Sequence, residues 1–172
     1  MPMRAEMKKV ELAVGKVVVT RERVLDHLKA RRVALPVQGP WEQQTLEIEE
    51  RLYPCWLAVV TAYADRRPFS PKRHVYPLYI DALSGKNFLI KRLPPTISRE
   101  VRDQGRLIDP VVSEQQARQY VEELKEKQIK GLYIFKKPKE FSVEMKMTFR
   151  PVWEVRHSGG VVRINQFSGE VE

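Results

Sequence analysis

The amino-acid sequence predicts an α+β fold built from two tandem repeats, each a helix packed on an antiparallel β-sheet of about three to four strands. The prediction depends on three observations: two strand-like segments that match each other, a Ser-Gly turn after each, and an amphipathic helical pattern before each. In both segments apolar residues recur at every second position, which is the period of a half-buried strand.

The strand-like segments are residues 43–56 and 140–153, and they align without a gap at an offset of 97 residues. Downstream, the stretch YIDALSGK at 79–86 resembles RINQFSGE at 163–170. These matches define a structural signature of paired positions: Pro54 and Pro151, Trp56 and Trp153, Asp81 and Asn165, Gly85 and Gly169. Glycine tolerates positive φ and Asp or Asn caps nearby backbone N–H groups, so the turn residues are interpreted as structural.

The helical patterns start at Thr20 and at Ser113. Ser113 and Gln116 form a capping-box sequence, and an apolar stripe follows them at helical spacing. The first copy has 13 more residues than the second between its second and third strands, centred on a loop at 64–74, whereas Ser158-Gly159-Gly160 closes the second copy tightly. The resulting domain prediction is a first repeat at 1–92, a linker at 93–105 with a short helix over 97–104, and a second repeat at 106–172.

The order of helix, alternating strands and Trp-centred strand, with the turns at 80–86 and 164–171, resembles the PepSY-like family. Units of that family end in a strand of the type Val-Asp-Ala-x-Thr-Gly-Lys/Glu-Val. The resemblance implies a cystatin-like shape and a non-enzymatic role in binding or inhibiting peptidases, or in regulating envelope proteins. The sequence differs from the family in lacking an export signal and in carrying Asn165 where the family has Asp, which argues against a conventional envelope role.

The composition favours anionic partners but does not require them. The net charge is +9 and the pI is near 9.7, a balance that suits nucleic acid, an acidic protein or an anionic surface, and that is also common in basic proteomes. Neither an apolar leader nor a run long enough to span a bilayer is present, so a cytoplasmic location is predicted unless the chain is a fragment of a longer exported protein.

The residues do not indicate catalysis, a metal or a cofactor. Cys55 is the single cysteine and is interpreted as buried and inert, because no basic partner is tied to it by the sequence. The three histidines are scattered, and neither a phosphate-binding glycine loop nor a metal-ligand spacing occurs. Trp56 and Trp153 are interpreted as core residues, although stacking on a base or cradling a peptide is the alternative.

The chain is therefore predicted to be a non-catalytic module that binds another protein or a peptide, with a homodimer through a sheet edge as one form. The alternative is a protein that binds nucleic acid or another polyanion. For either partner, the candidate residues are Arg66, Arg67, Phe69, Lys72 and Arg73 of the loop at 64–74. Two further cationic groups follow, one at Lys86, Lys91, Arg92, Arg99, Arg102 and Arg106, the other at Lys136, Lys137 and Lys139. Solvation of loops and protection of sheet edges explain such clusters equally well.

Overall fold

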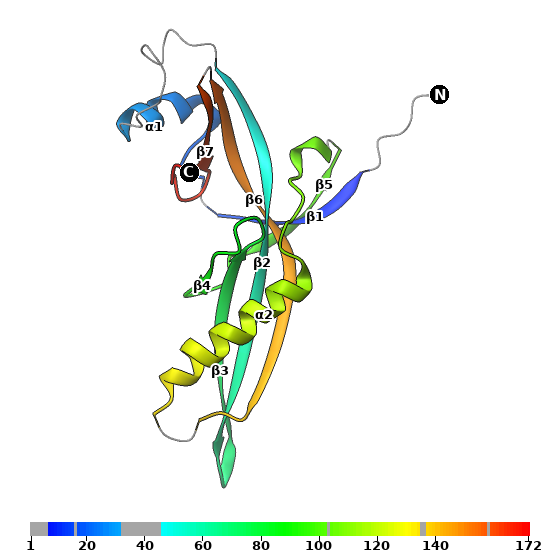
Figure 1. Ribbon diagram of the computed structural model, residues 1–172, viewed down its shortest axis with the longest axis vertical. Helices are drawn as coiled ribbons and strands as arrows, with labels where there is room; N and C mark the ends of the chain where they lie inside the picture. Colours follow the sequence, from blue (N-terminus) through cyan, green and yellow to red (C-terminus); the bar gives the residue numbers. More distant parts are fainter. Residues whose placement is uncertain (1–6, 16, 32–45, 103, 135–136, 158) are drawn as a thin grey trace. The chain divides into compact units, whose positions relative to one another are not determined.

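The computed structural model describes residues 7–15, 17–31, 46–102, 104–134, 137–157 and 159–172. Within them the chain forms mainly strands (Figure 1). The strands are β1 (Lys8–Ala13), β2 (Glu47–Arg66), β3 (Phe69–Asp81), β4 (Asn87–Leu89), β5 (Thr96–Val101), β6 (Glu140–His157) and β7 (Gly160–Asn165). The α-helices are α1 (Val24–Ala30), which follows a 3₁₀ turn at Arg21–Arg23, and α2 (Glu114–Leu124), which continues as a π turn at Lys125–Ile129 and a 3₁₀ turn at Lys130–Leu132.

The strands form one seven-stranded sheet in the order β4-β3-β2-β6-β1-β5, with β7 paired to β6 outside this path. Antiparallel ladders join β2 to β3, β3 to β4, β6 to β7 and β1 to β5. The chain also divides into two compact units, each assembled from separate stretches of sequence. Unit 1 comprises Met1–Tyr53, Thr96–Ile108 and Arg150–Glu172, and unit 2 comprises Pro54–Pro95 and Asp109–Phe149.

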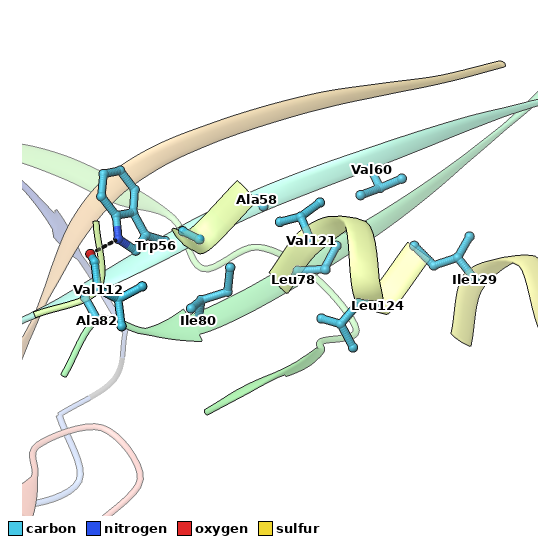
Figure 2. Packing of buried hydrophobic residues seen from close by; sticks show 11 residues of the cluster. Trp56, Ala58, Val60, Leu78, Ile80, Ala82, Val112, Val121, Leu124 and Ile129 are labelled. Atoms are coloured by element: carbon cyan, nitrogen blue, oxygen red, sulfur yellow. Dashed lines mark hydrogen bonds between the residues drawn. The ribbon is translucent and has the colours of Figure 1, made fainter. Parts of the chain in front are cut away.

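In unit 2, α2 lies along the sheet formed by β2 and β3 and covers its apolar face (Figure 1). The helix begins where expected, because Ser113 and Gln116 make both hydrogen bonds of a capping box. Val121 and Leu124 of the helix face Leu78 and Ile80 of β3 in Figure 2. The cluster that results is Trp56, Ala58, Val60, Leu78, Ile80, Ala82, Val112, Ala117, Val121, Leu124 and Ile129.

In unit 1, α1 supplies Val24 and Leu28 to a smaller core. Its other buried members come from the segment before the helix, from β6 and from β7: Val19, Val155, Val162 and Ile164. Trp153, Leu46 and Ile48 pack against this cluster while remaining partly exposed. Among the described residues, α1 and α2 thus each pack on part of the one sheet and shield apolar side chains there from water.

The Trp-centred sites of the two units have the same hydrogen bonds. The indole N–H of Trp56 donates to the carbonyl of Val112, and that of Trp153 donates to the carbonyl of Val19, each over 2.9 Å. The carbonyl of Pro54 accepts from Ala82 N–H, just as that of Pro151 accepts from Gln166 N–H.

The two turns are also closed alike. The side chains of Asp81 and Asn165 each accept two backbone N–H groups, from the residues two and three positions ahead. Gly85 and Gly169 have φ of 76° and 72°, a conformation that glycine adopts without steric cost.

The predicted architecture of two tandem helix-on-sheet repeats is nevertheless wrong. The α+β content and the antiparallel pairing are confirmed, but all seven strands belong to one sheet. The 20-residue β2 and the 18-residue β6 each continue from one compact unit into the other. Their apolar alternation passes through Pro54 and Pro151 without a break, so nothing in the local sequence ends either strand there. The predicted boundaries at 1–92, 93–105 and 106–172 stay a prediction.

Two local predictions also fail. The short helix expected over 97–104 is mostly strand, because β5 covers Thr96–Val101 and pairs with β1 over its whole length. The loop expected at 64–74 is largely strand as well, since β2 extends to Arg66 and β3 begins at Phe69. In both cases a partner strand decides the conformation, and pairing of this kind is not visible in short-range sequence patterns.

Truncation of Leu78 tests the packing of unit 2. Leu78 is fully buried under α2, so Leu78→Ala should lower the free energy of unfolding by about 2–5 kcal/mol. Phe88→Ala on the neighbouring β4 is the control, because Phe88 is an exposed side chain and its removal should cost far less. Urea denaturation of the three proteins gives the comparison; equal losses for the two variants would contradict this account of the core.

Candidate functional site

The far ends of β2 and β3 form a hairpin that we call the hairpin arm, residues 63–74. Figure 1 shows this hairpin extending past the end of α2 in unit 2. Ala58, Val60 and Ala62 of β2 are fully buried, and the first two belong to the core under the helix. Beyond that point none of the described helices covers the strands, and the side chains from Asp65 to Arg73 are exposed. The arm exists because the strands are longer than the helix that covers them.

The cations predicted from the sequence gather on this arm. Arg66, Lys72 and Arg73 are exposed and make no ion pair with any residue that the structure describes. Arg67 is also exposed, but its guanidinium lies 3.2 Å from the carboxylate of Asp65. The arm therefore carries three uncompensated positive charges over a short length of hairpin.

An aromatic side chain lies among these charges. Phe69 is 69% exposed, an unusual state for so large an apolar group. In the β2–β3 register Tyr63 is opposite Arg73 and Arg66 is opposite Phe69, so these four side chains share the face of the hairpin directed away from α2. Lys72 lies on the other face, with His74, whose ring meets Tyr133 edge-on.

A cavity of about 590 Å³ at this end of unit 2 joins the arm to a second basic segment. Lys137 and Lys139 lie just before β6, are exposed and make no ion pair with a described residue. In the sequence these two lysines form a cationic group separate from the loop at 64–74. The third member of that group, Lys136, lies outside the described residues. The full lining is Tyr63, Asp65, Arg67, Phe69, Pro71, Lys137, Lys139 and Glu140.

The structural signature residues lie away from the arm. Trp56 is 9% exposed and belongs to the core of unit 2, whereas Trp153 is half-buried in unit 1. Pro54 and Pro151 are buried within β2 and β6, and the four turn residues close hairpin ends. The two tryptophans and the two prolines make hydrogen bonds between segments, and Asp81 and Asn165 make hydrogen bonds within their turns.

The cysteine is buried, and two of the histidines contact backbone groups. Cys55 is 1% exposed, so its thiol is shielded from solvent. The Nε2 of His27 is 2.7 Å from the carbonyl of Gly169, and the Nδ1 of His157 accepts the N–H of Gly159. Across the described ranges no group of three or more His, Cys, Asp or Glu side chains is arranged to hold a metal ion.

Sequence reasoning missed a buried polar network in unit 1. The hydroxyl of Tyr53 donates to Glu154 over 2.6 Å and accepts from Nε of Arg163 over 2.6 Å. Arg51 lies nearby, with its Nε 3.9 Å from Glu154. These residues lie on three different strands, so only the strand pairing could have revealed that they meet.

Comparison with protein-family models, with curated proteins and with solved structures finds no match to this chain. The PepSY-like resemblance therefore stays a prediction. None of the helices in the described part of the chain has the length and apolar content that a membrane-spanning helix requires.

The tyrosine in this network makes the stability of the protein sensitive to alkaline pH. Burial and the hydrogen bond to Glu154 raise the pKa of Tyr53 to about 12, from an ordinary value of 10.0. The neutral phenol is thus favoured in the folded state, and its stabilisation is complete below pH 10 and lost as the pH rises towards 12.

We expect Tyr53→Phe to be less stable than the unaltered protein at pH 8, because two hydrogen bonds are lost, and the difference to narrow between pH 10 and 12. Urea denaturation midpoints measured across that range test this. A difference that stays constant up to pH 12 would show that Tyr53 does not titrate in this way.

Proposed function

We propose that this chain is a non-catalytic binding protein whose hairpin arm binds a polyanion, with single-stranded nucleic acid as the partner. The observation that carries the proposal is the cavity at the arm, where Phe69 and Arg67 meet Lys137 and Lys139. Single-stranded nucleic acid offers phosphates for such cations and unpaired bases for such an aromatic ring.

The geometry of the arm suits an extended ligand better than a compact one. Phe69, Arg66 and Arg73 share one face of the hairpin, and the two lysines add charge beside it. Strand geometry spaces alternate residues on one face by about 6–7 Å, close to the distance between successive phosphates along a strand. A chain of phosphates can therefore contact several of these cations at once.

A binding role also fits the state of the reactive side chains. A nucleophilic thiol must be accessible to its substrate, and Cys55 is buried. Two of the three histidine rings are hydrogen-bonded to backbone groups and the third packs against Tyr133.

Removal of the arm's cations should weaken nucleic-acid binding in a salt-dependent way. For single strands each phosphate contact contributes about −0.7 to the slope of log K against log salt, so Arg66, Arg67, Lys72 and Arg73 all changed to Ala should flatten the slope by up to about 3. Fluorescence anisotropy with a mixed-sequence DNA or RNA oligomer, titrated from ~50 mM salt upwards, gives this slope.

The matched control changes four exposed cations away from the arm, Lys86, Lys91, Arg92 and Arg118, and therefore lowers the net charge equally. It should leave the slope nearly unchanged. If both quadruple variants lose affinity alike, the attraction is a property of net charge and the arm is not the site. Absence of micromolar binding at ~50 mM salt by the unaltered protein would refute the proposed function, since non-specific binders register there.

Stacking by Phe69 should favour single strands over duplex. Phe69→Ala removes an interaction on the order of 1–3 kcal/mol per base, so affinity for a single-stranded oligomer should fall about 5- to 140-fold, whereas affinity for a duplex changes little. Phe88→Ala, which removes another exposed phenylalanine, is the control. Equal losses on single strands and duplex would exclude base stacking by Phe69.

A second candidate, binding of a peptide by strand addition, has one observation in its favour. On the outer side of β3 only Leu78–Ile80 pair with β4, so the stretch from Phe69 to Tyr76 has no strand beside it among the described residues. Pro71 lies within that stretch and has no N–H to donate, which limits pairing there. Binding of an uncharged peptide at this edge would depend little on salt, so the titrations above distinguish the two candidates.

A further inference from the structure

Unit 1 contains its own cavity, of about 600 Å³, within the range of pockets that hold small ligands. Four separate stretches of chain supply its walls: the 3₁₀ turn before α1, the first half of β2, the turn after β5, and β6. The lining residues are Arg21, Ile48, Glu49, Glu50, Arg51, Gly105, Arg106 and Trp153. Three arginines thus reach one cavity from three different elements.

Both lining carboxylates have cationic partners: Glu49 pairs with Arg51 within the lining, and Glu50 pairs with Arg99 outside it. Glu49 accepts from the guanidinium of Arg51 over 2.8 Å. Glu50 lies 3.7 Å from the guanidinium of Arg99 and accepts from the amide of Gln166 over 2.9 Å. In contrast, the side chain of Arg21 makes no ion pair or hydrogen bond with any described residue. The cavity therefore carries surplus positive charge where Arg21 enters it.

One of the arginines is held in place before any ligand arrives. Arg51 is only 20% exposed and donates to Glu49 and to the carbonyl of Gly105. A guanidinium fixed in this way loses little freedom when an anion binds, which favours affinity. Planar guanidinium groups match the oxygen geometry of phosphate.

The Trp153 ring contributes an aromatic wall. Its indole N–H is fixed by the carbonyl of Val19, and the side chain is half-buried. In the alignment of residues 43–56 with residues 140–153, Met147 of unit 2 matches Glu50 of unit 1. Met147 packs against the core that contains the buried Trp56. Unit 1 thus has a charged residue and a cavity where unit 2 has apolar packing, and Trp153 both packs against the core of unit 1 and lines this cavity.

We propose that this cavity binds a nucleoside monophosphate. The arginines match the phosphate, the Trp153 ring is placed to stack on the base, and the rim carboxylates of Glu49 and Glu50 can accept hydroxyl groups of the ribose. A simple inorganic anion would leave the aromatic wall unused, and an uncharged nucleoside would leave the arginine charge unused. The proposal does not depend on the hairpin arm.

The test is isothermal titration calorimetry of the intact chain with three probes: adenosine monophosphate, adenosine and inorganic phosphate. We expect the monophosphate to bind with a dissociation constant below about 1 mM, and each of the other two at least about tenfold more weakly. Arg21→Gln should weaken monophosphate binding about 10- to 100-fold, since a charged hydrogen bond is lost. Arg106→Gln is a second variant with the same expected direction.

Arg118→Gln, an exposed arginine on α2, is the matched control and should bind as the unaltered protein does. The quadruple hairpin-arm variant should also keep full affinity for the monophosphate, which separates this site from the proposed function. Unfolding midpoints confirm that each variant is folded. The proposal is overturned if the monophosphate does not bind, if phosphate or adenosine binds equally well, or if neither Arg21→Gln nor Arg106→Gln lowers the affinity.

Discussion

The hydrogen bond from the indole of Trp56 to the carbonyl of Val112 is the interaction on which the arrangement of unit 2 depends (Figure 2). Val112 immediately precedes the capping box of α2, so the bond ties the start of the helix to β2. Backbone N–H groups of Val111 and Val112 also donate to the carbonyl of Ala82, just beyond β3. Because the residues just before the helix are held at β2 and at the end of β3, the helix lies along the sheet face that carries Leu78 and Ile80. Beyond the end of the helix the side chains from Asp65 to Arg73 are exposed, and they form the outer part of the hairpin arm.

The parts of this fold that sequence could predict are those governed by neighbours along the chain. The capping box at Ser113, the turns at Asp81 and Asn165, and the apolar alternation of the Trp-centred strands are local patterns, and the structure contains them. The predictions failed where a residue distant in sequence determines the local secondary structure. Residues 97–104 have no strong local preference, and pairing with β1 makes most of them a strand. Alternation also carries no information on where a strand stops, so the sequence predicts separate repeats where β2 and β6 each continue through both units.

In the candidate sites, too, residues close together in sequence could be predicted to form a group, whereas residues far apart in sequence could not. The cations and the phenylalanine of the arm all lie within residues 66–73, so they form a cluster that is visible in the sequence. Lys137 and Lys139 could not be assigned to the same surface, because only the pairing of long strands brings the start of β6 to the tip of the hairpin. Arg21 and Arg51 belong to none of the cationic groups of the sequence, and they meet Arg106 only through the fold of unit 1.

The two basic sites differ in a way that bears on what each can bind. The arm's charges lie on exposed strand positions in high-dielectric solvent, where a single contact contributes little and affinity requires several contacts along an extended partner. In unit 1 the guanidinium of Arg51 is mostly buried and held by Glu49 and Gly105, so an anionic group in the adjacent cavity would meet a fixed guanidinium at lower dielectric together with the surplus charge of Arg21. The exposed cations spread along the arm therefore favour a polymer whose charges are distributed along its length. The partly enclosed cavity of unit 1 favours a small ligand with concentrated charge. The two proposed sites thus place arginine in different settings: exposed on the strands of the arm, and, in unit 1, a partly buried Arg51 beside the exposed Arg21 and Arg106.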